Sequence, residues 1–267
     1  MKKQIVICYI AMVIISLFVL VPIILITIGT FTPRLELYKW PRGLISSRFT
    51  SDSFISFAQS YGVMNGLKNS IMVAVLTVVF SLLIGIPAGY SLSRFKFKGK
   101  SLFTVGVLTT RMFPIAILAV PLVKIYMGLG IYDSILGVAF IHTIFAFPFA
   151  ILISHSIFAS VPGELEEAAM VLGCSRLGAF RRTTLPLVAP GIAAIAIFAF
   201  IISWNEVFAA TLLTLHNRTL PALIVARLEA TTLDFLFASA FFMLVPCIVF
   251  IFIIRKRLLR MWGIILR

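Results

Sequence analysis

Six long apolar runs divide this chain, and they constrain its fold more than any other feature. The hydrocarbon core of a membrane is about 30 Å thick, so a helix needs roughly 20 apolar residues to cross it. Helices also pair their own backbone groups, which lipid requires. We therefore predict one all-α integral membrane domain over residues 1–267. Its six transmembrane helices are expected at 5–29, 70–92, 101–123, 135–158, 189–213 and 235–254.

Composition agrees with membrane insertion. The chain is 61% hydrophobic and 12% charged, and a soluble domain of this length needs more polar surface. A net charge of +14 would suit nucleic-acid binding, but lysines and arginines also flank the cytoplasmic ends of spans, so no nucleic-acid partner is expected. The run 5–29 is too long for the core of a signal peptide and is interpreted as an uncleaved first span. Pro148 and Pro190 are expected to break the fourth and fifth spans, as neighbouring helices allow.

The distribution of basic residues predicts the orientation. Fourteen lysines and arginines fall on the side of the two termini and eight on the other side. The densest group, Arg94, Lys96, Lys98 and Lys100, lies between the second and third spans. Because cytoplasmic loops carry the excess of basic residues, both termini are expected in the cytoplasm.

The longest cytoplasmic loop, 159–188, is predicted to form a helix–turn–helix. Ser160 is expected to cap its first helix, and Pro162 suits a first turn. Three acids follow, where the positive end of the helix dipole favours them. These acids are Glu164, Glu166 and Glu167.

The end of this helix is also predicted from local chemistry. Gly173 suits a left-handed residue just past the last turn. Ser175 is expected to start a second short helix that ends before Pro186. The small side chains of Ala168 and Ala169 would let another protein approach the backbone closely.

The order Glu167-Ala168-Ala169, Gly173 and Thr183-Thr-Leu185-Pro186 resembles the loop signature of ABC importer permeases. Thr183 departs from the isoleucine of that pattern. The stretches 67–100, 130–137, 147–149 and 203–206 resemble permeases of the maltose-type carbohydrate importers. The chain's ending, 260–267, departs from the small-residue tail common in that family.

The resemblance implies a type I ABC importer fold and a multi-pass protein of a prokaryotic inner membrane. It also implies a second permease, two ATP-binding subunits and an extracytoplasmic solute-binding protein as partners, besides membrane lipid. ATP and Mg would bind the ATP-binding subunits, so this chain is expected to be no enzyme and to hold no cofactor. Each ATP-binding subunit would receive one coupling helix. The coupling residues implied here are Glu166, Glu167, Ala168, Ala169, Gly173, Leu185 and Pro186.

Four residues within the spans are candidates for the solute pathway. Arg111 and Glu206 are ionisable, and such groups usually face the bundle interior or a water-filled path. Trp204 and Asn205 suit stacking on and hydrogen bonding to a sugar ring. Structural pairing, snorkelling to the interface and helix packing are the alternatives. Oligosaccharides, polyols and glycerol phosphates all remain open as solutes.

Other functional classes have weaker support. An ion-coupled secondary transporter predicts paired acids within spans and an inverted repeat, and only Glu206 is a clear intramembrane acid. A membrane-embedded enzyme needs clustered catalytic groups. The three cysteines and three histidines lack metal-ligand spacing. Gly85 and Gly89 form a small-xxx-small pair that would suit close helix packing.

Overall fold

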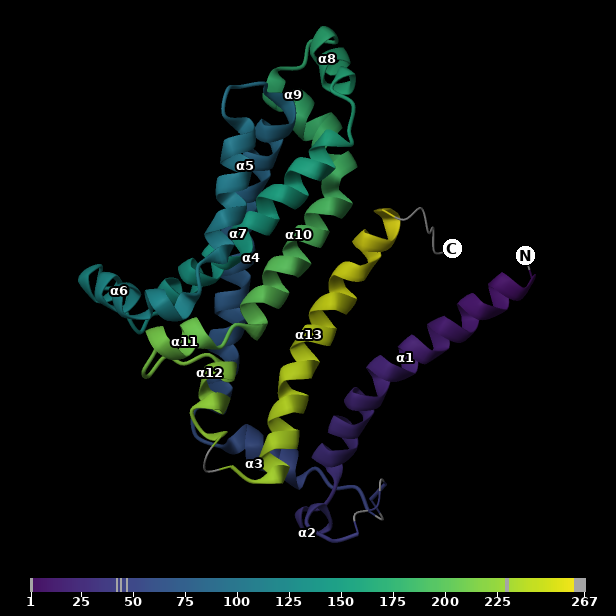
Figure 1. The fold of residues 1–267 in the computed structure, drawn as a ribbon, viewed down its shortest axis with the longest axis vertical. Helices are drawn as coiled ribbons and strands as arrows, with labels where there is room; N and C mark the ends of the chain where they lie inside the picture. Colours follow the sequence, from purple (N-terminus) through teal and green to yellow (C-terminus); the bar gives the residue numbers. More distant parts are fainter. Residues whose placement is uncertain (1, 42, 44, 47, 229–230, 262–267) are drawn as a thin grey trace. The chain divides into compact units, whose positions relative to one another are not determined.

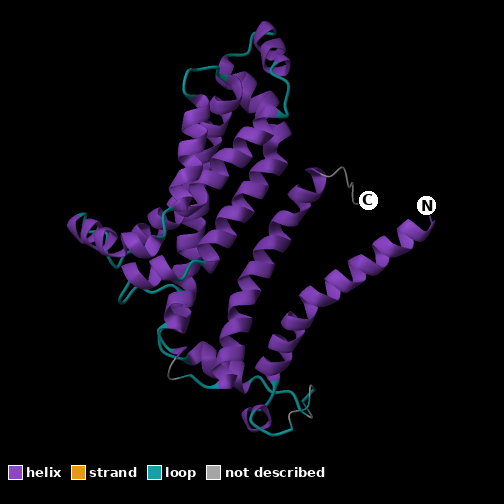
Figure 2. Cartoon of the chain, viewed as in Figure 1, coloured by secondary structure: helices purple, strands orange, loops and turns teal. Residues whose placement is uncertain are grey.

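The computed structural model describes residues 2–41, 43, 45–46, 48–228 and 231–261, and every regular element in these ranges is a helix (Figures 1 and 2). Within this part of the chain, five helices are long and apolar enough to cross a membrane, and the number rises to six if a bent pair, Lys100–Met112 with Ile115–Gly128, is counted as one span. The predicted all-α class is confirmed. Arg42 and the atypical tail from residue 262 onward lie outside the described residues.

The chain divides into two compact units, Met1–Met64 with Ala226–Pro246, and Asn65–Val225 with Cys247–Arg267. The first unit holds α1 (Lys2–Phe31), α2 (Arg34–Leu37), α3 (Asp52–Gln59) and the beginning of α13 (Leu233–Met261). Phenylalanine rings pack in its core. The ring of Phe54 stacks on that of Phe242 with 4.7 Å between the ring centres, and the edge-to-face pair of Phe57 and Phe235 has 4.8 Å between the centres. The Thr30 hydroxyl donates to the Phe237 carbonyl at 2.9 Å and links α1 to α13.

The second unit carries the remaining helices. In Figure 1, α4, α5, α7 and α10 form its bundle, with α8 and α9 at one end and α11 and α12 at the other. The bundle helices are α4 (Val63–Arg94), α5 (Lys100–Thr109), α7 (Ile135–Ala159) and α10 (Leu185–Asn205), and α6 (Ile115–Gly128) projects from their side. The end helices are α8 (Glu164–Val171), α9 (Arg176–Ala179), α11 (Phe208–Leu213) and α12 (Leu220–Val225).

Glycines bring α4 and α7 into close contact. A Cβ atom added at Gly85 would lie 2.7 Å from the Ala150 Cβ, and one at Gly89 would lie 2.4 Å from the Ser154 Cβ. These distances are shorter than van der Waals contact, so only glycine allows the two backbones to approach this far. The predicted packing face of Gly85 and Gly89 is thereby confirmed.

Two predicted spans have different boundaries in the structure. The third span is not straight, because α5 with its 3₁₀ turn meets α6 at an angle of 92°. Phe113 is extended there, since the ring of Pro114 disfavours helical backbone in the preceding residue. The fifth span ends at Asn205 rather than at residue 213. Glu206 leaves the helix, and its carboxylate accepts the N–H groups of Ala209 and Ala210 at the start of α11.

The expected breaks at Pro148 and Pro190 are wrong, because α7 and α10 continue through both residues. The two helices pack against each other over most of their length (Figure 1). Tertiary packing of this kind outweighs the loss of one backbone hydrogen bond at each proline.

Replacing Gly89 by valine is expected to destabilise the second unit by about 1–3 kcal/mol, because the new side chain overlaps Ser154. Thermal denaturation of the detergent-solubilised protein would measure the loss. Gly106→Val in α5 is the matched control, since open space surrounds that position. Equal melting temperatures for the two variants would show that α4 and α7 are not in close contact.

Candidate functional site

The loop between α7 and α10 begins differently from the prediction. Helix α8 starts at Glu164 after Gly163, and no side chain caps it. Ser160 belongs to the end of α7 instead, where its hydroxyl donates to the Ile157 carbonyl at 2.7 Å. The prediction that Ser160 caps the loop helix is therefore wrong. The acids do lie in the first turn of α8, as expected from the helix dipole.

The turn after α8 follows the prediction. Gly173 has a φ of +92°, which is the left-handed conformation that glycine adopts without strain. The Ser175 hydroxyl accepts the N–H of Gly178 at 3.2 Å and begins α9. This second helix does not end before Pro186, however. It continues through one π-helical turn, Phe180–Thr184, into α10, and Pro186 follows directly after that turn as the second residue of α10.

A buried carboxylate holds this loop against the bundle. Glu166 is only 6% exposed. Its Oε1 accepts hydrogen bonds from Arg94 Nε at 3.0 Å, Arg94 Nη2 at 2.9 Å and Thr184 Oγ1 at 2.6 Å. Its Oε2 accepts one from the Tyr90 hydroxyl at 2.7 Å. We call these four residues the Glu166 anchor. It joins the end of α4, the helix α8 and the segment that leads into α10.

The arginine of the anchor also serves the end of α7. Arg94 Nη1 donates to the carbonyls of Phe158 at 3.1 Å and Val161 at 2.9 Å. Helix C-termini leave carbonyl groups without partners, and a basic side chain satisfies them. One guanidinium therefore pairs with the loop carboxylate and caps α7.

The anchor also changes the acidity of Glu166. Burial by itself would raise the pKa of this carboxyl group. Hydrogen bonds from Thr184, Tyr90 and Arg94, together with the charge of Arg94, outweigh burial and hold the pKa below its ordinary value. The carboxylate is thus stabilised in its charged form at neutral pH.

The neighbouring acid faces the other way. Glu167 and Ala168 are exposed, and Ala169 is half-buried. Beyond them, Val171 and Leu172 are 87% and 86% exposed, although both are apolar. Among the described side chains, no lysine, arginine or histidine forms an ion pair with Glu167. The loop therefore has an inner face held by Glu166 and a free outer face with one carboxylate and two apolar side chains.

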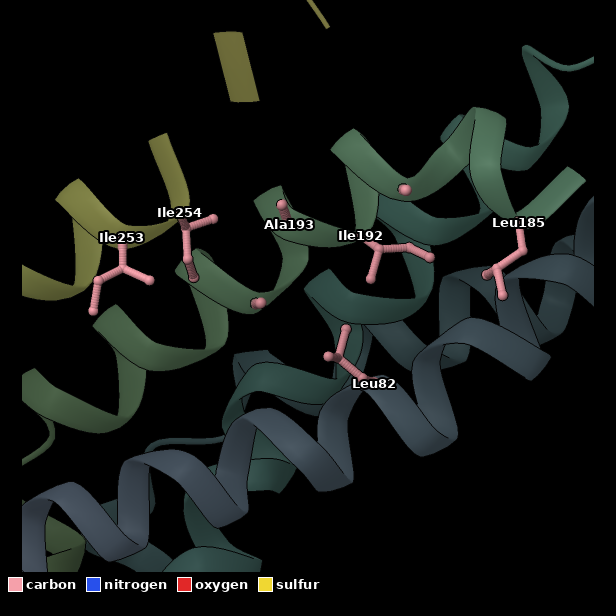
Figure 3. Close-up of a pocket in the computed structure, with 8 residues that line it drawn as sticks. Leu82, Leu185, Ile192, Ala193, Ile253 and Ile254 are labelled. Atoms are coloured by element: carbon pink, nitrogen blue, oxygen red, sulfur yellow. The ribbon is translucent and has the colours of Figure 1, made fainter. Parts of the chain in front are cut away.

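The last predicted loop residues lie away from this outer face. Leu185 lines an apolar cavity of about 480 Å³ (Figure 3). Figure 3 shows Ile192 and Ala193 of α10 beside it, Leu82 of α4 below, and Ile253 and Ile254 of α13 at the far end. Pro186 is exposed at the start of α10. Leu185 thus packs within the bundle.

Two candidate pathway residues belong to the packing around the break after α10. The Glu206 carboxylate lies 3.2 Å from His142 Nε2 and accepts N–H groups of α11. His142 is fully buried, and its Nδ1 lies 2.9 Å from the Ser203 hydroxyl. Trp204 is 2% exposed and stacks on Phe200. The side chains of Glu206 and Trp204 therefore hold helices together.

The other two candidates are exposed. Arg111 lies at the bend between α5 and α6, with its guanidinium carbon 4.2 Å from the centre of the Phe149 ring. It lines a cavity of about 300 Å³ together with Phe113, Ile141 and Phe145. Asn205 is exposed, and its amide donates to the Ile201 carbonyl at 3.0 Å.

Sequence reasoning missed a set of hydrogen bonds at the opposite end of the bundle, which join Asp133 to residues 215–217 and are called the Asp133 latch below. Asp133 has a φ of +53°, and its carboxylate accepts the N–H groups of Leu215, His216 and Asn217 at 2.9–3.2 Å. Burial would raise the pKa of this group, but these backbone donors outweigh burial and lower it. The Asn217 amide returns a bond to the Asp133 carbonyl at 2.7 Å. The turn before α7 and the loop after α11 are thereby joined.

In the described part of the chain, no three histidine, cysteine, aspartate or glutamate side chains gather closely enough to hold an ion. Its cysteines, Cys8, Cys174 and Cys247, are free thiols.

Comparison with known proteins places this geometry in context. The family described as "Binding-protein-dependent transport system inner membrane component" matches residues 81–262. The trehalose transport permease SugB of Mycobacterium tuberculosis is 31% identical over 221 residues, which cover 80% of this chain and 81% of that protein. The diacetylchitobiose uptake permease DasC of Streptomyces coelicolor is 39% identical over 140 residues, which cover 52% of this chain and 51% of DasC.

A solved structure shares the fold. One chain of a bacterial ABC transporter involved in the import of the acidic polysaccharide alginate superposes with a TM-score of 0.75 at 20% identity. The match covers 94% of this chain and 95% of that one. The type I importer fold expected from the sequence is confirmed.

Replacing Glu166 by glutamine is expected to destabilise the loop by about 3 kcal/mol, because the buried charge of Arg94 loses its partner. A lowered folded-state pKa stabilises the wild type above the unfolded pKa of about 4.3, and this stabilisation is lost as the pH falls through the folded value. Thermal denaturation from neutral to acid pH should therefore show a steeper acid decline for the wild type than for the variant. Glu164→Gln, an exposed acid of the same turn, is the control. Parallel curves for the wild type and Glu166→Gln would exclude the anchor.

Replacing Asp133 by alanine is expected to release the loop at 215–217. The backbone N–H groups lose a charged acceptor, which is worth roughly 1.5–3 kcal/mol, so their hydrogen exchange should accelerate about tenfold or more. Hydrogen-exchange mass spectrometry of the detergent-solubilised chain measures this rate. Amides inside α10 are the internal control and should not change. Unchanged exchange at 215–217 would contradict the latch.

Proposed function

This chain belongs to the family of binding-protein-dependent transport system inner membrane components, and on that basis we propose that it is the permease subunit of an ATP-driven saccharide importer. Membership makes it a multi-pass protein of the inner membrane and a permease, not the enzyme that hydrolyses ATP. The observation that carries the proposal is the loop 159–188, whose inner face is fixed and whose outer face is free.

The outer face of the loop suits a protein partner. Val171 and Leu172 expose apolar side chains at the tip of a polar loop, where water is an unfavourable surrounding. Glu167 adds a carboxylate that is available for a charge-assisted hydrogen bond. Ala168 and Gly173 leave room for close approach of another backbone. We propose that this face docks in an ATP-binding subunit, which itself holds ATP and Mg.

The inner face suits the transmission of movement. Because the Glu166 anchor joins α4, α8 and the start of α10, a displacement of α8 would carry these helices with it. A loop without such bonds would absorb the displacement in its own backbone. Closure of an ATPase dimer would thus reorient the spans. In this proposal Glu166 positions the coupling helix, and Glu167 makes the contact.

The remaining partners follow from the family. We propose a second permease that completes the pathway, two ATP-binding subunits, an extracytoplasmic solute-binding protein, and termini in the cytoplasm. A saccharide solute is supported by relatives whose names specify trehalose and diacetylchitobiose. Arg111 and Asn205 are the exposed side chains proposed for the pathway, and Trp204 and Glu206 shape the break beside it.

Glu167→Arg and Leu172→Asp are expected to reduce co-purification of the ATP-binding subunit with the tagged chain at least about tenfold, since the few residues that dominate an interface each cost about 2 kcal/mol or more when replaced. Sugar uptake into cells should fall in parallel. Leu35→Asp is the matched control, because Leu35 is 83% exposed but lies in α2, far along the sequence from the loop.

Retention of the ATP-binding subunit by both loop variants would contradict the coupling role. A wild-type chain that purifies without any ATP-binding subunit, and whose uptake follows an ion gradient, would instead favour the ion-coupled transporter.

A further inference from the structure

A second apolar cavity lies beside the Glu166 anchor and shares no lining residue with the cavity in Figure 3. Its volume is about 470 Å³. It opens between the end of α4 and the segment formed by α9 and the π-helical turn. Its walls are Ile86, Pro87, Tyr90, Arg176, Leu177 and Phe180.

The depth of the cavity is set by α4. Arg94 is the last residue of this helix, and Ile86 lies eight residues before it, which is about 12 Å along the axis. The cavity thus lies beside the last turns of a long apolar helix that is a candidate membrane span, next to the polar loop. Its walls suit hydrocarbon, since the hydroxyl of Tyr90 is directed to Glu166 and only the ring is left to line the cavity.

A single cation lines the cavity where it meets the polar loop. Arg176 is exposed, and its guanidinium carbon lies 5.9 Å from the centre of the Phe95 ring. The nearby carboxylate of Glu166 is already paired with Arg94. In the described part of the chain, Arg176 forms no ion pair.

Other basic side chains near Arg176 in the sequence and on the adjoining segments make the surface beside the cavity positively charged. Four other basic side chains on the adjoining segments are exposed, namely Lys96, Lys98, Arg181 and Arg182. An apolar cavity beside the end of a candidate membrane span, with a guanidinium that forms no ion pair at its edge, complements a molecule that has a hydrocarbon chain and a negative head.

We propose that this cavity binds an anionic phospholipid, with one acyl chain between α4 and the π-helical turn and the phosphate on Arg176. Charge-assisted hydrogen bonds from a guanidinium to phosphate oxygens supply the head-group selectivity. The apolar side chains of Ile86, Leu177 and Phe180 bury the acyl chain of the lipid, and they do not distinguish one head group from another. Since Tyr90 belongs both to the cavity and to the Glu166 anchor, the lipid contacts the element that holds the loop.

Photolabelling in the assembled importer tests this site. The complex is placed in phosphatidylcholine nanodiscs with a trace of phosphatidylglycerol or phosphatidylcholine that carries a diazirine on its acyl chain. The labelled peptides are then mapped by mass spectrometry. The phosphatidylglycerol probe is expected to label 86–90 and 176–180 about fivefold more than the phosphatidylcholine probe, as one favourable charge near the surface provides.

Two variants and one control define the outcome. Arg176→Gln should lower labelling by the anionic probe to the level of the zwitterionic one, while Arg182→Gln should leave the difference intact. Leu177→Trp should reduce labelling by both probes, because the indole fills the cavity. Excess inorganic phosphate should not displace the lipid, since it lacks the acyl chain.

Three results would overturn the proposal. Equal labelling by the two probes would remove the selectivity, and an equal loss in Arg176→Gln and Arg182→Gln would reduce it to general surface charge. Absence of label from these peptides would mean that a partner subunit or the chain itself fills the cavity. The site rests on the proposed assembly, but the labelling needs neither transport nor ATP hydrolysis, so its result is independent of the proposed saccharide.

Discussion

A buried carboxylate is stable only when charged and polar donors replace the water around it, and Glu166 has such donors on both oxygens. These donors come from the end of α4 and from the segment before α10. Arg94, which supplies two of them, also closes the end of α7. The position of the loop helix therefore depends on this ion pair and on the hydrogen bonds around it. The side chains of α8 that take no part in these bonds form the outer face of the loop.

The spans could be predicted because their length is set by the thickness of the bilayer. Hydropathy does not reveal where the backbone leaves a helix within an apolar run. The bend at Pro114 lies inside such a run, and so does the break at Glu206. The reverse error occurred at Pro148 and Pro190, where packing between α7 and α10 preserves the helix. Local sequence gives the potential for a break, and tertiary contacts decide whether it forms.

In the candidate site too, the features set by neighbouring residues could be predicted, and the features set by distant residues could not. Gly173 and Ser175 were predictable because a left-handed turn and a helix cap depend on neighbours in the chain. The separate roles of Glu166 and Glu167 were not, because successive helical residues point about 100° apart and the deciding partner, Arg94, is 72 residues away. The pairing of His142 with Glu206 and the latch at Asp133 also join distant segments. An acid within an apolar run predicts that some residue pairs with its carboxylate, but the sequence does not show which residue this is.

The glycine contact between α4 and α7 has a mechanical consequence. With Gly89 against Ser154 and no side chain between the backbones, neither helix can slide along the other without a clash. Arg94 fastens the same two helices one turn further on. The two helices are therefore joined at two points along their length. Under the proposed coupling, a displacement of the loop would move both helices together, and the bend at Pro114 and the break at Glu206 are the places where the backbone already leaves the helix.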